Sequence, residues 1–304
     1  MITVLGAFDG FHRGHVKLLE RAKIMANSLG KDWGVVTFEP HPGLFLGAVE
    51  STLFTRREME IISARLGVPR AVLLTFDKSL SEMPPKAFWD FLRSQTSIDG
   101  VVVGSDFRFG FERAGDAALL GSFCYGDSIP FECVDLVLSD GSKVSSSAIR
   151  SCVSGGECEK AAEKLGYPWF IEGDIMHGVA RGRTLGFPTA NLNVTHRKLL
   201  PPDGVYATSA TIDVGGSAES RPAALSIGVN PTFDDSTGKT VEAFILDYDG
   251  DLYGETITIS FLSRLRPQVK FSDSSALVQQ IKSDVERTRE IFLTSKASLS
   301  RLDA

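Results

Sequence analysis

The sequence predicts two domains: an N-terminal α/β domain with a Rossmann-like parallel sheet, and a C-terminal antiparallel β-barrel followed by a helix. A chain of 304 residues is long enough for two hydrophobic cores. In the first 165 residues, short β-branched runs alternate with segments of helical period, which is typical of a parallel sheet. From about Tyr167, strand-like runs separated by Gly, Pro and Asp indicate an antiparallel barrel or sandwich. We therefore place the domains at residues 1–165 and 166–304.

Helix signals in the first domain follow the first strand. Apolar residues at helical spacing predict a helix over residues 12–29, which Gly30 would end. The apolar stripe of this helix consists of Val16, Leu19, Ala22 and Ala26. The predicted strands of the first domain are residues 2–5, 34–38, 71–76 and 101–103.

The second domain contains mainly predicted strands and one long helix. Ser272 or Asp273 is expected to cap a helix that runs to about residue 292, with Leu277, Ile281 and Val285 on the face that covers the barrel. The predicted strands are residues 170–176, 205–212, 223–229, 241–246 and 256–262.

Composition excludes several classes of protein. Hydrophobic residues make up 43% and charged residues 23%, as in ordinary globular proteins. Thirty-two basic and 38 acidic residues give a net charge of -6, so no overall positive field favours nucleic acid. No apolar run is long enough to span a membrane, and we expect a cytoplasmic protein. The four cysteines have no C-x-x-C spacing, so we expect neither a disulfide framework nor a zinc site.

A first candidate site follows the first predicted strand, in the stretch GAFDGFHRGH at residues 6–15. His12 and His15 are three residues apart at a helix start, where backbone amides favour phosphate. Gly14 would let a ligand approach the backbone. Two imidazole donors there can stabilise charge that develops on an α-phosphate during nucleotidyl transfer. The alternative is that the two histidines only cap the helix.

Three further segments are expected at the carboxyl ends of strands or before a helix: TFEPHP (37–42), GSDFRFG (104–110) and KVSSSAIR (143–150). For His41 we favour a loop residue held between prolines over a catalytic one. Phe107, Phe109 and Phe111 could form ordinary core or apolar faces for a flavin ring.

These segments resemble, in order and spacing, the adenylyltransferase module of bifunctional bacterial riboflavin kinase/FMN adenylyltransferases, also called FAD synthetases. The resemblance covers essentially the whole chain. It implies that His12 and His15 hold ATP phosphates and that Arg150 faces the pyrophosphate leaving group. It also implies nucleotide contacts from Gly10, Gly14, Asp106, Ser146 and Ser147, and a flavin contact from Phe109.

A second candidate site is the stretch GVARGRTLGFPTAN at residues 178–191. By itself it could be a basic surface hairpin or a phosphate-binding loop, and it lacks the P-loop pattern. Thr189 and Asn191 are two residues apart, so in an extended chain both can point toward a metal ion with its phosphates. Glu242 precedes an apolar run and must lie at a strand face or mouth.

The second stretch is similar to the hallmark of the riboflavin kinase module. This resemblance implies that Gly182 binds nucleotide, that Thr189 and Asn191 organise Mg²⁺ with ATP, and that Glu242 is the general base. It further implies a loop over residues 264–271 that closes over the flavin and the nucleotide, with Arg266 as a flavin contact.

The implied function is phosphorylation of riboflavin to FMN and then adenylylation of FMN to FAD, with ATP and Mg²⁺ in both steps. The implied partners are riboflavin, FMN, FAD and ATP, without nucleic acid or membrane. A weak homo-oligomer stays open, because the sequence carries no signal of oligomeric state. One alternative is another acceptor, such as pantetheine phosphate, nicotinamide mononucleotide or glycerol phosphate. The other is a flavin-binding regulatory protein that has lost one or both activities.

Overall fold

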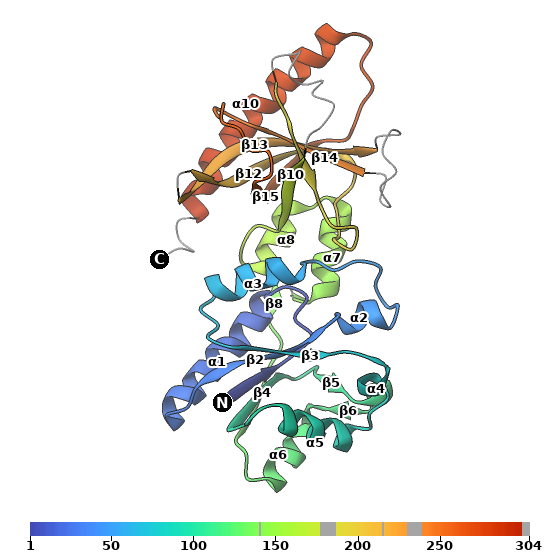
Figure 1. The fold of residues 1–304 in the computed structure, drawn as a ribbon, viewed down its shortest axis with the longest axis vertical. Coiled ribbons are helices and arrows are strands. Elements are labelled where there is room, and N and C mark those ends of the chain that lie inside the picture. Colours follow the sequence, from blue (N-terminus) through green and yellow to red (C-terminus); the bar gives the residue numbers. More distant parts are fainter. Residues whose placement is uncertain (140, 177–186, 215, 230–238, 300–304) are drawn as a thin grey trace. The chain divides into compact units, whose positions relative to one another are not determined.

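The computed structural model describes residues 1–139, 141–176, 187–214, 216–229 and 239–299 (Figure 1). The chain divides into two compact units, Met1–Ala148 and Ile149–Ala304. Two helices, α7 (Ser146–Gly155) and α8 (Cys158–Leu165), stand at this division. Helix α8 packs against a strand of the second unit, which groups it with that unit rather than with the residues before it.

The first unit contains a five-stranded parallel sheet in the order β3-β2-β1-β4-β7. The predicted parallel sheet is therefore confirmed. The strand β7 (Phe131–Val134) was not among the predicted strands. It lies at the edge of the sheet, contains Glu132, and only its Val134 is buried. The other strands are β1 (Ile2–Leu5), β2 (Trp33–Glu39), β3 (Ala71–Thr75) and β4 (Gly100–Gly104).

The helix α1 (Arg13–Leu29) begins at the N-cap His12 and ends at Gly30, whose φ of 62° suits glycine. The buried residues of α1 are Leu18, Leu19, Ala22 and Ala26. The predicted apolar stripe contained Val16, which is only partly buried, and did not contain Leu18. The remaining helices of this unit are α2 (Pro42–Phe45), α3 (Arg56–Arg65), α4 (Lys78–Ser81), α5 (Pro85–Gln95) and α6 (Ala117–Gly126). Short elements also occur: β5 (Arg108–Phe109), η1 (Phe111–Arg113), β6 (Gly115–Asp116), β8 (Leu138–Ser139) and β9 (Ser142–Lys143).

One core cluster of the first unit lies between the sheet and the helices α5 and α6. Trp89 and Leu92 of α5 and Leu120 of α6 are fully buried with the apolar side chains of β4. A core of this kind makes the sheet rigid, and so fixes the positions of the loops that leave its strand ends.

The second unit is a closed six-stranded antiparallel barrel in the order β10-β11-β14-β13-β12-β15. Closure decides between the barrel and the sandwich that the sequence left open, and it removes free strand edges. The strand β11 was not among the predicted strand-like runs, and its first two residues, Ala190 and Asn191, belong to the phosphate-loop candidate. The strands are β10 (Phe170–Met176), β11 (Ala190–Asn193), β12 (Gly204–Val214), β13 (Ser217–Val229), β14 (Lys239–Ile245) and β15 (Thr256–Arg266).

The final helix α10 (Ser274–Leu299) packs along β12, β13 and β15 on the outside of the barrel (Figure 1). Asp273 is the capping residue, because its carboxylate accepts a hydrogen bond from the backbone N–H of Ala276 at 2.9 Å. Within the described ranges, no helix combines the length and the apolar character needed to cross a membrane.

Candidate functional sites

The first site lies at the point where the strand order of the parallel sheet reverses. Strand β1 pairs with β2 on one side and β4 on the other, and the chain continues to α1 after β1. The loops after β1 and β4 therefore leave the sheet side by side at its carboxyl edge, where open α/β sheets bind ligands. His12 and His15 come from the first loop and Asp106 from the second.

The imidazole rings of His12 and His15 are stacked, with their centroids 3.7 Å apart and an interplanar angle of 14°. His12 Nδ1 accepts a hydrogen bond from the backbone N–H of His15 at 3.2 Å. The ring of Phe8 closes the other side of His15 in an edge-to-face contact at 4.9 Å. His12 is therefore a helix cap, as the alternative interpretation expected, and it also faces the second histidine.

Hydrogen bonds distinguish the two histidine tautomers. Because His12 Nδ1 is an acceptor, the proton of the neutral ring must be on Nε2, which is then a hydrogen-bond donor. His15 Nδ1 lies 2.7 Å from the carbonyl oxygen of Gly10, so Nδ1 carries the proton and donates it. A neutral His15 consequently has an unprotonated Nε2. The pair can offer a phosphate one donor at rest, and a second donor after His15 takes up a proton.

Burial keeps both rings neutral. It lowers the pKa of His12 from 6.5 to about 2, and the charges of His15 and Lys143 act in the same direction. Burial also lowers the pKa of His15 to about 4, although the Gly10 carbonyl and Asp106 act to raise it. A bound polyphosphate would add negative charge beside both rings and favour their protonated forms.

Glycines around the histidines have different physical roles. Gly10 has a φ of 93°, a conformation that favours glycine, and its carbonyl holds His15. A Cβ at Gly14 would lie 3.0 Å from Cε1 and 3.1 Å from Nδ1 of His12. The absent side chain of Gly14 therefore makes room for the His12 ring. Its expected role of admitting a ligand to the backbone stays a prediction.

Charged groups surround the first site. The ammonium of Lys143 is 2.5 Å from a carboxylate oxygen of Asp106, and both side chains are largely exposed. Asp9 is a functional candidate that the sequence did not single out. Its carboxylate is buried and accepts the backbone N–H groups of Leu53, at 2.8 Å, and Phe54, at 3.4 Å. Asp9 thus ties the histidine loop to a distant segment, a pairing without local sequence signal.

The serine segment begins a helix rather than preceding it. Ser146 and Ser147 form the first turn of α7, and Ser146 donates a long hydrogen bond of 3.4 Å to the Asp9 carbonyl. Ser147 is exposed. Arg150 follows Ser146 by four residues and therefore shares its face of α7.

The aromatic residues of the GSDFRFG segment divide between core and surface. Phe109 is buried against Phe88, Phe107 and Phe123, whereas Phe111 is exposed. His41 caps α2 by accepting the N–H of Gly43 at 3.0 Å, which supports a local structural role. The flavin contact of Phe109 stays a prediction.

The second site is a row of polar residues on the outer face of the barrel. In β14 the buried residues Val241, Ala243 and Ile245 alternate with Glu242, which therefore faces outward. Glu242 is directly opposite Asn191 of β11 and Ser226 of β13. We call Asn191, Glu242 and Ser226 the outer row, because cross-strand partners lie on one face of a sheet.

Thr189 joins the outer row from the segment before β11. Its hydroxyl is 3.5 Å from a carboxylate oxygen of Glu242, so the expected side chains Thr189, Asn191 and Glu242 are brought together. Gly182 and most of the GVARGRTLGFPTAN stretch lie outside the described residues. Among the described residues, no group of three or more His, Cys, Asp or Glu side chains could hold a metal ion.

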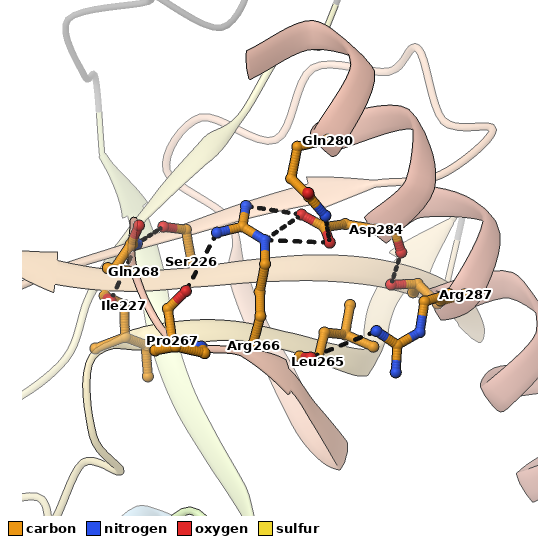
Figure 2. Close-up of polar contacts among 10 residues, drawn as sticks. Ser226, Ile227, Leu265, Arg266, Pro267, Gln268, Gln280, Asp284 and Arg287 are labelled. Carbon is orange, nitrogen blue, oxygen red and sulfur yellow. Dashed lines mark hydrogen bonds and ion pairs between the residues drawn. The ribbon is translucent and has the colours of Figure 1, made fainter. Parts of the chain in front are cut away.

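Arg266 ends β15 and points at the helix α10 rather than away from the barrel (Figure 2). Its Nε and Nη2 donate to the buried carboxylate of Asp284 at 2.8–3.2 Å, and Gln280 donates to the same carboxylate at 3.0 Å. Nη1 donates to the carbonyl of Pro267. This ion pair lay beyond sequence reasoning, because its partners are 18 residues apart on different elements. A flavin contact of Arg266 stays a prediction.

The buried histidine pair predicts that the protein loses stability in mild acid. The pKa of His12 is lower in the folded state than its unfolded value of 6.5. The contribution of His12 to the free energy of unfolding is therefore complete above pH 6.5 and declines as the pH falls. The decline is about 1.4 kcal/mol per pH unit below about 6.5. Thermal unfolding at about pH 7.5 and pH 5 should show a larger loss in the wild type than in His12→Gln.

The matched control is His196→Gln, which changes an exposed histidine of the second unit. This variant should keep the pH dependence of the wild type. An equal acid-induced loss of thermal stability in the wild type and in His12→Gln would contradict the lowered pKa of His12.

Comparison with known proteins connects both units to one enzyme family. The FAD synthetase family matches residues 1–148, and the riboflavin kinase family matches residues 165–292. A bifunctional riboflavin kinase/FMN adenylyltransferase from Listeria monocytogenes is 34% identical over 96% of this chain and 92% of its own. Its counterpart from Bacillus subtilis is 32% identical over 96% and 92%.

A solved structure from Streptococcus pneumoniae has the same fold over nearly the full length. It is described as a macrolide-efflux protein, and it is 32% identical to this chain, with a TM-score of 0.84 over 95% of this chain and 93% of its own. Because the matches extend over both units at this identity, the chain belongs to the family of bifunctional riboflavin kinase/FMN adenylyltransferases.

Proposed function

We propose that the two units carry out two consecutive steps of flavin cofactor synthesis. The second unit transfers the γ-phosphoryl group of ATP to the 5′-hydroxyl of riboflavin, and the products are FMN and ADP. The first unit joins the phosphate of FMN to the α-phosphorus of a second ATP, and the products are FAD and pyrophosphate. The observation that carries the proposal is that each unit groups the polar residues that its family's reaction needs.

In the phosphorylation step, Glu242 accepts the proton of the 5′-hydroxyl as its oxygen bonds to the γ-phosphorus. Its carboxylate faces outward from the barrel. Among the described residues, Thr189 is its one side-chain hydrogen-bond partner. Asn191 is opposite Glu242 and Thr189 is next to it, so we assign the side of Glu242 that these residues occupy to the nucleotide. A base that only orients the hydroxyl is sufficient, because positioning and electrostatics dominate phosphoryl transfer.

Both reactions need a divalent metal ion, and we propose that it is Mg²⁺. The donor set fits, because the hydroxyl of Thr189 and the amide oxygen of Asn191 are hard oxygen ligands that stand beside the carboxylate of Glu242. Mg²⁺ is usually held by one or two protein oxygens and by the phosphates of the substrate, so a dense acidic cluster is unnecessary. When bound, it neutralises charge that develops on the phosphates.

In the adenylylation step, the histidine pair stabilises the α-phosphate while the new P–O bond forms. His12 donates from Nε2 in its neutral form, and His15 becomes a donor after proton uptake at Nε2. Lys143 adds a positive charge close to His12, and Arg150 is assigned to the departing pyrophosphate. The bond from the α-phosphorus to the bridging oxygen breaks, and no covalent enzyme intermediate is needed.

We also propose a cytoplasmic location, where ATP supplies both steps. A weak homo-oligomer stays a hypothesis.

Glu242→Gln is expected to lower the kcat of FMN formation about 10²- to 10⁴-fold, because the amide cannot accept the proton. Riboflavin, excess ATP and Mg²⁺ are incubated with the purified protein, and the flavins are separated by chromatography over time. FAD formation from added FMN is the internal control and should stay at the wild-type rate. Unchanged FMN formation in Glu242→Gln and in Asn191→Ala would refute the assigned kinase site.

The double variant His12→Ala with His15→Ala is expected to show the opposite pattern in the same assay. FMN should accumulate without FAD, since both phosphate donors are lost while the barrel is untouched. Unchanged FAD formation would refute the adenylylation site. Flavin binding by the wild-type protein without any new flavin product would instead support the regulatory binding protein.

A further inference from the structure

The serine of the outer row has a hydroxyl proton that no acceptor in the described part of the chain takes up. Ser226 is directly opposite Glu242 on the outer face of the barrel, and its neighbours Leu225 and Ile227 are buried in the interior. Cross-strand partners have Cβ atoms about 5 Å apart, so Ser226 and Glu242 are neighbours on this face of the barrel.

Gln268 determines how this hydroxyl is oriented (Figure 2). Its side-chain nitrogen lies 3.3 Å from the carbonyl oxygen of Ile227, which can only accept, so the nitrogen end of the amide must face β13. The same nitrogen donates to Ser226 Oγ at 2.8 Å. Ser226 Oγ is therefore the acceptor in that bond, and its own proton is left to donate to another group.

The ion pair between Arg266 and Asp284 keeps Gln268 in this place. Arg266 is anchored to the helix α10 by the buried carboxylate of Asp284, and it also holds the carbonyl of Pro267, the residue before Gln268. Gly228 leaves space beside the Gln268 amide, because a Cβ there would lie 3.3 Å from the amide nitrogen. The segment from Arg266 to Gln268 is thus held at one end by Asp284 and at the other by β13.

The position of Ser226 indicates which substrate it meets. Phosphoryl transfer needs the leaving oxygen and the attacking oxygen in line, on opposite sides of the phosphorus. Asn191 and Thr189 are on one side of Glu242 and are assigned to the nucleotide, whereas Ser226 is on the other side. The acceptor chain therefore extends over Ser226 once its 5′-hydroxyl is at Glu242.

We propose that Ser226, oriented by Gln268, binds a hydroxyl of the ribityl chain of riboflavin next to the one that reacts. This inference rests on the proposed kinase site and adds the residue that positions the acceptor. Gln268 is a positioning residue, since it acts through Ser226. The hydroxyl of Ser226 selects a substrate with a polyhydroxylated chain, because a substrate without that hydroxyl would leave the Ser226 proton unpaired.

The experiment measures the kinase step in Ser226→Ala and Gln268→Ala. Each variant should raise the KM for riboflavin about three- to tenfold, with kcat and the KM for ATP changed less than about twofold, as expected for a contact remote from the reacting atoms. Ser226→Thr keeps the hydroxyl and should restore the wild-type KM. The double variant should raise the KM no further than Ser226→Ala alone.

The matched control is Gln95→Ala, which removes a similar contact between a glutamine and a serine, Ser94, on an exposed helix of the first unit. It should leave all kinase constants unchanged. A riboflavin KM within about twofold of the wild type in Ser226→Ala would overturn the inference, and so would additive effects in the double variant. Either result can occur while Glu242→Gln is inactive, so failure of this inference is distinguishable from failure of the kinase site.

Discussion

Backbone pairing in a fixed register is the constraint on which both sites depend. In the first unit, parallel pairing of β1 with β2 and β4 brings the histidine loop and the Asp106 loop to one edge of the sheet. In the second unit, antiparallel pairing aligns Asn191, Glu242 and Ser226 across three strands. A slip of one residue in β14 would turn Glu242 into the barrel interior and Val241 outward. The apolar core that prevents such a slip therefore also protects the chemistry.

Three side chains in or next to the two sites are held by bonds to backbone groups. His12 and His15 use Nδ1 to bind an amide and a carbonyl, which fixes the protonation of the opposite nitrogen. Gln268 likewise uses a carbonyl of β13 to decide which end of its amide meets Ser226. Such contacts lower the reorganisation that a ligand would otherwise have to induce. Each of these side chains is thereby held in one orientation without a bound ligand.

Several expected site residues also have structural partners. The missing Cβ of Gly14 accommodates the ring of the nearby His12. Phe109 is buried in the core against Phe88 and Phe123, and Arg266 is paired with Asp284 of α10. The expected ligand contacts of these residues stay predictions. The partners of Phe109 and Arg266 come from other elements, so no local pattern encodes them.

The sequence by itself determined the strand and helix periods, the place of His12 and His15 after the first strand, and the place of Glu242 at a strand face or mouth beside an apolar run. These follow from local rules: side chains alternate along a strand, and a polar side chain that accepts a backbone N–H begins a helix. Only the tertiary structure decided that the barrel closes, that His12 and His15 stack, and that Ser226 stands opposite Glu242. Those outcomes depend on which strands pair and in which register, and pairing is settled by burial summed over the whole unit.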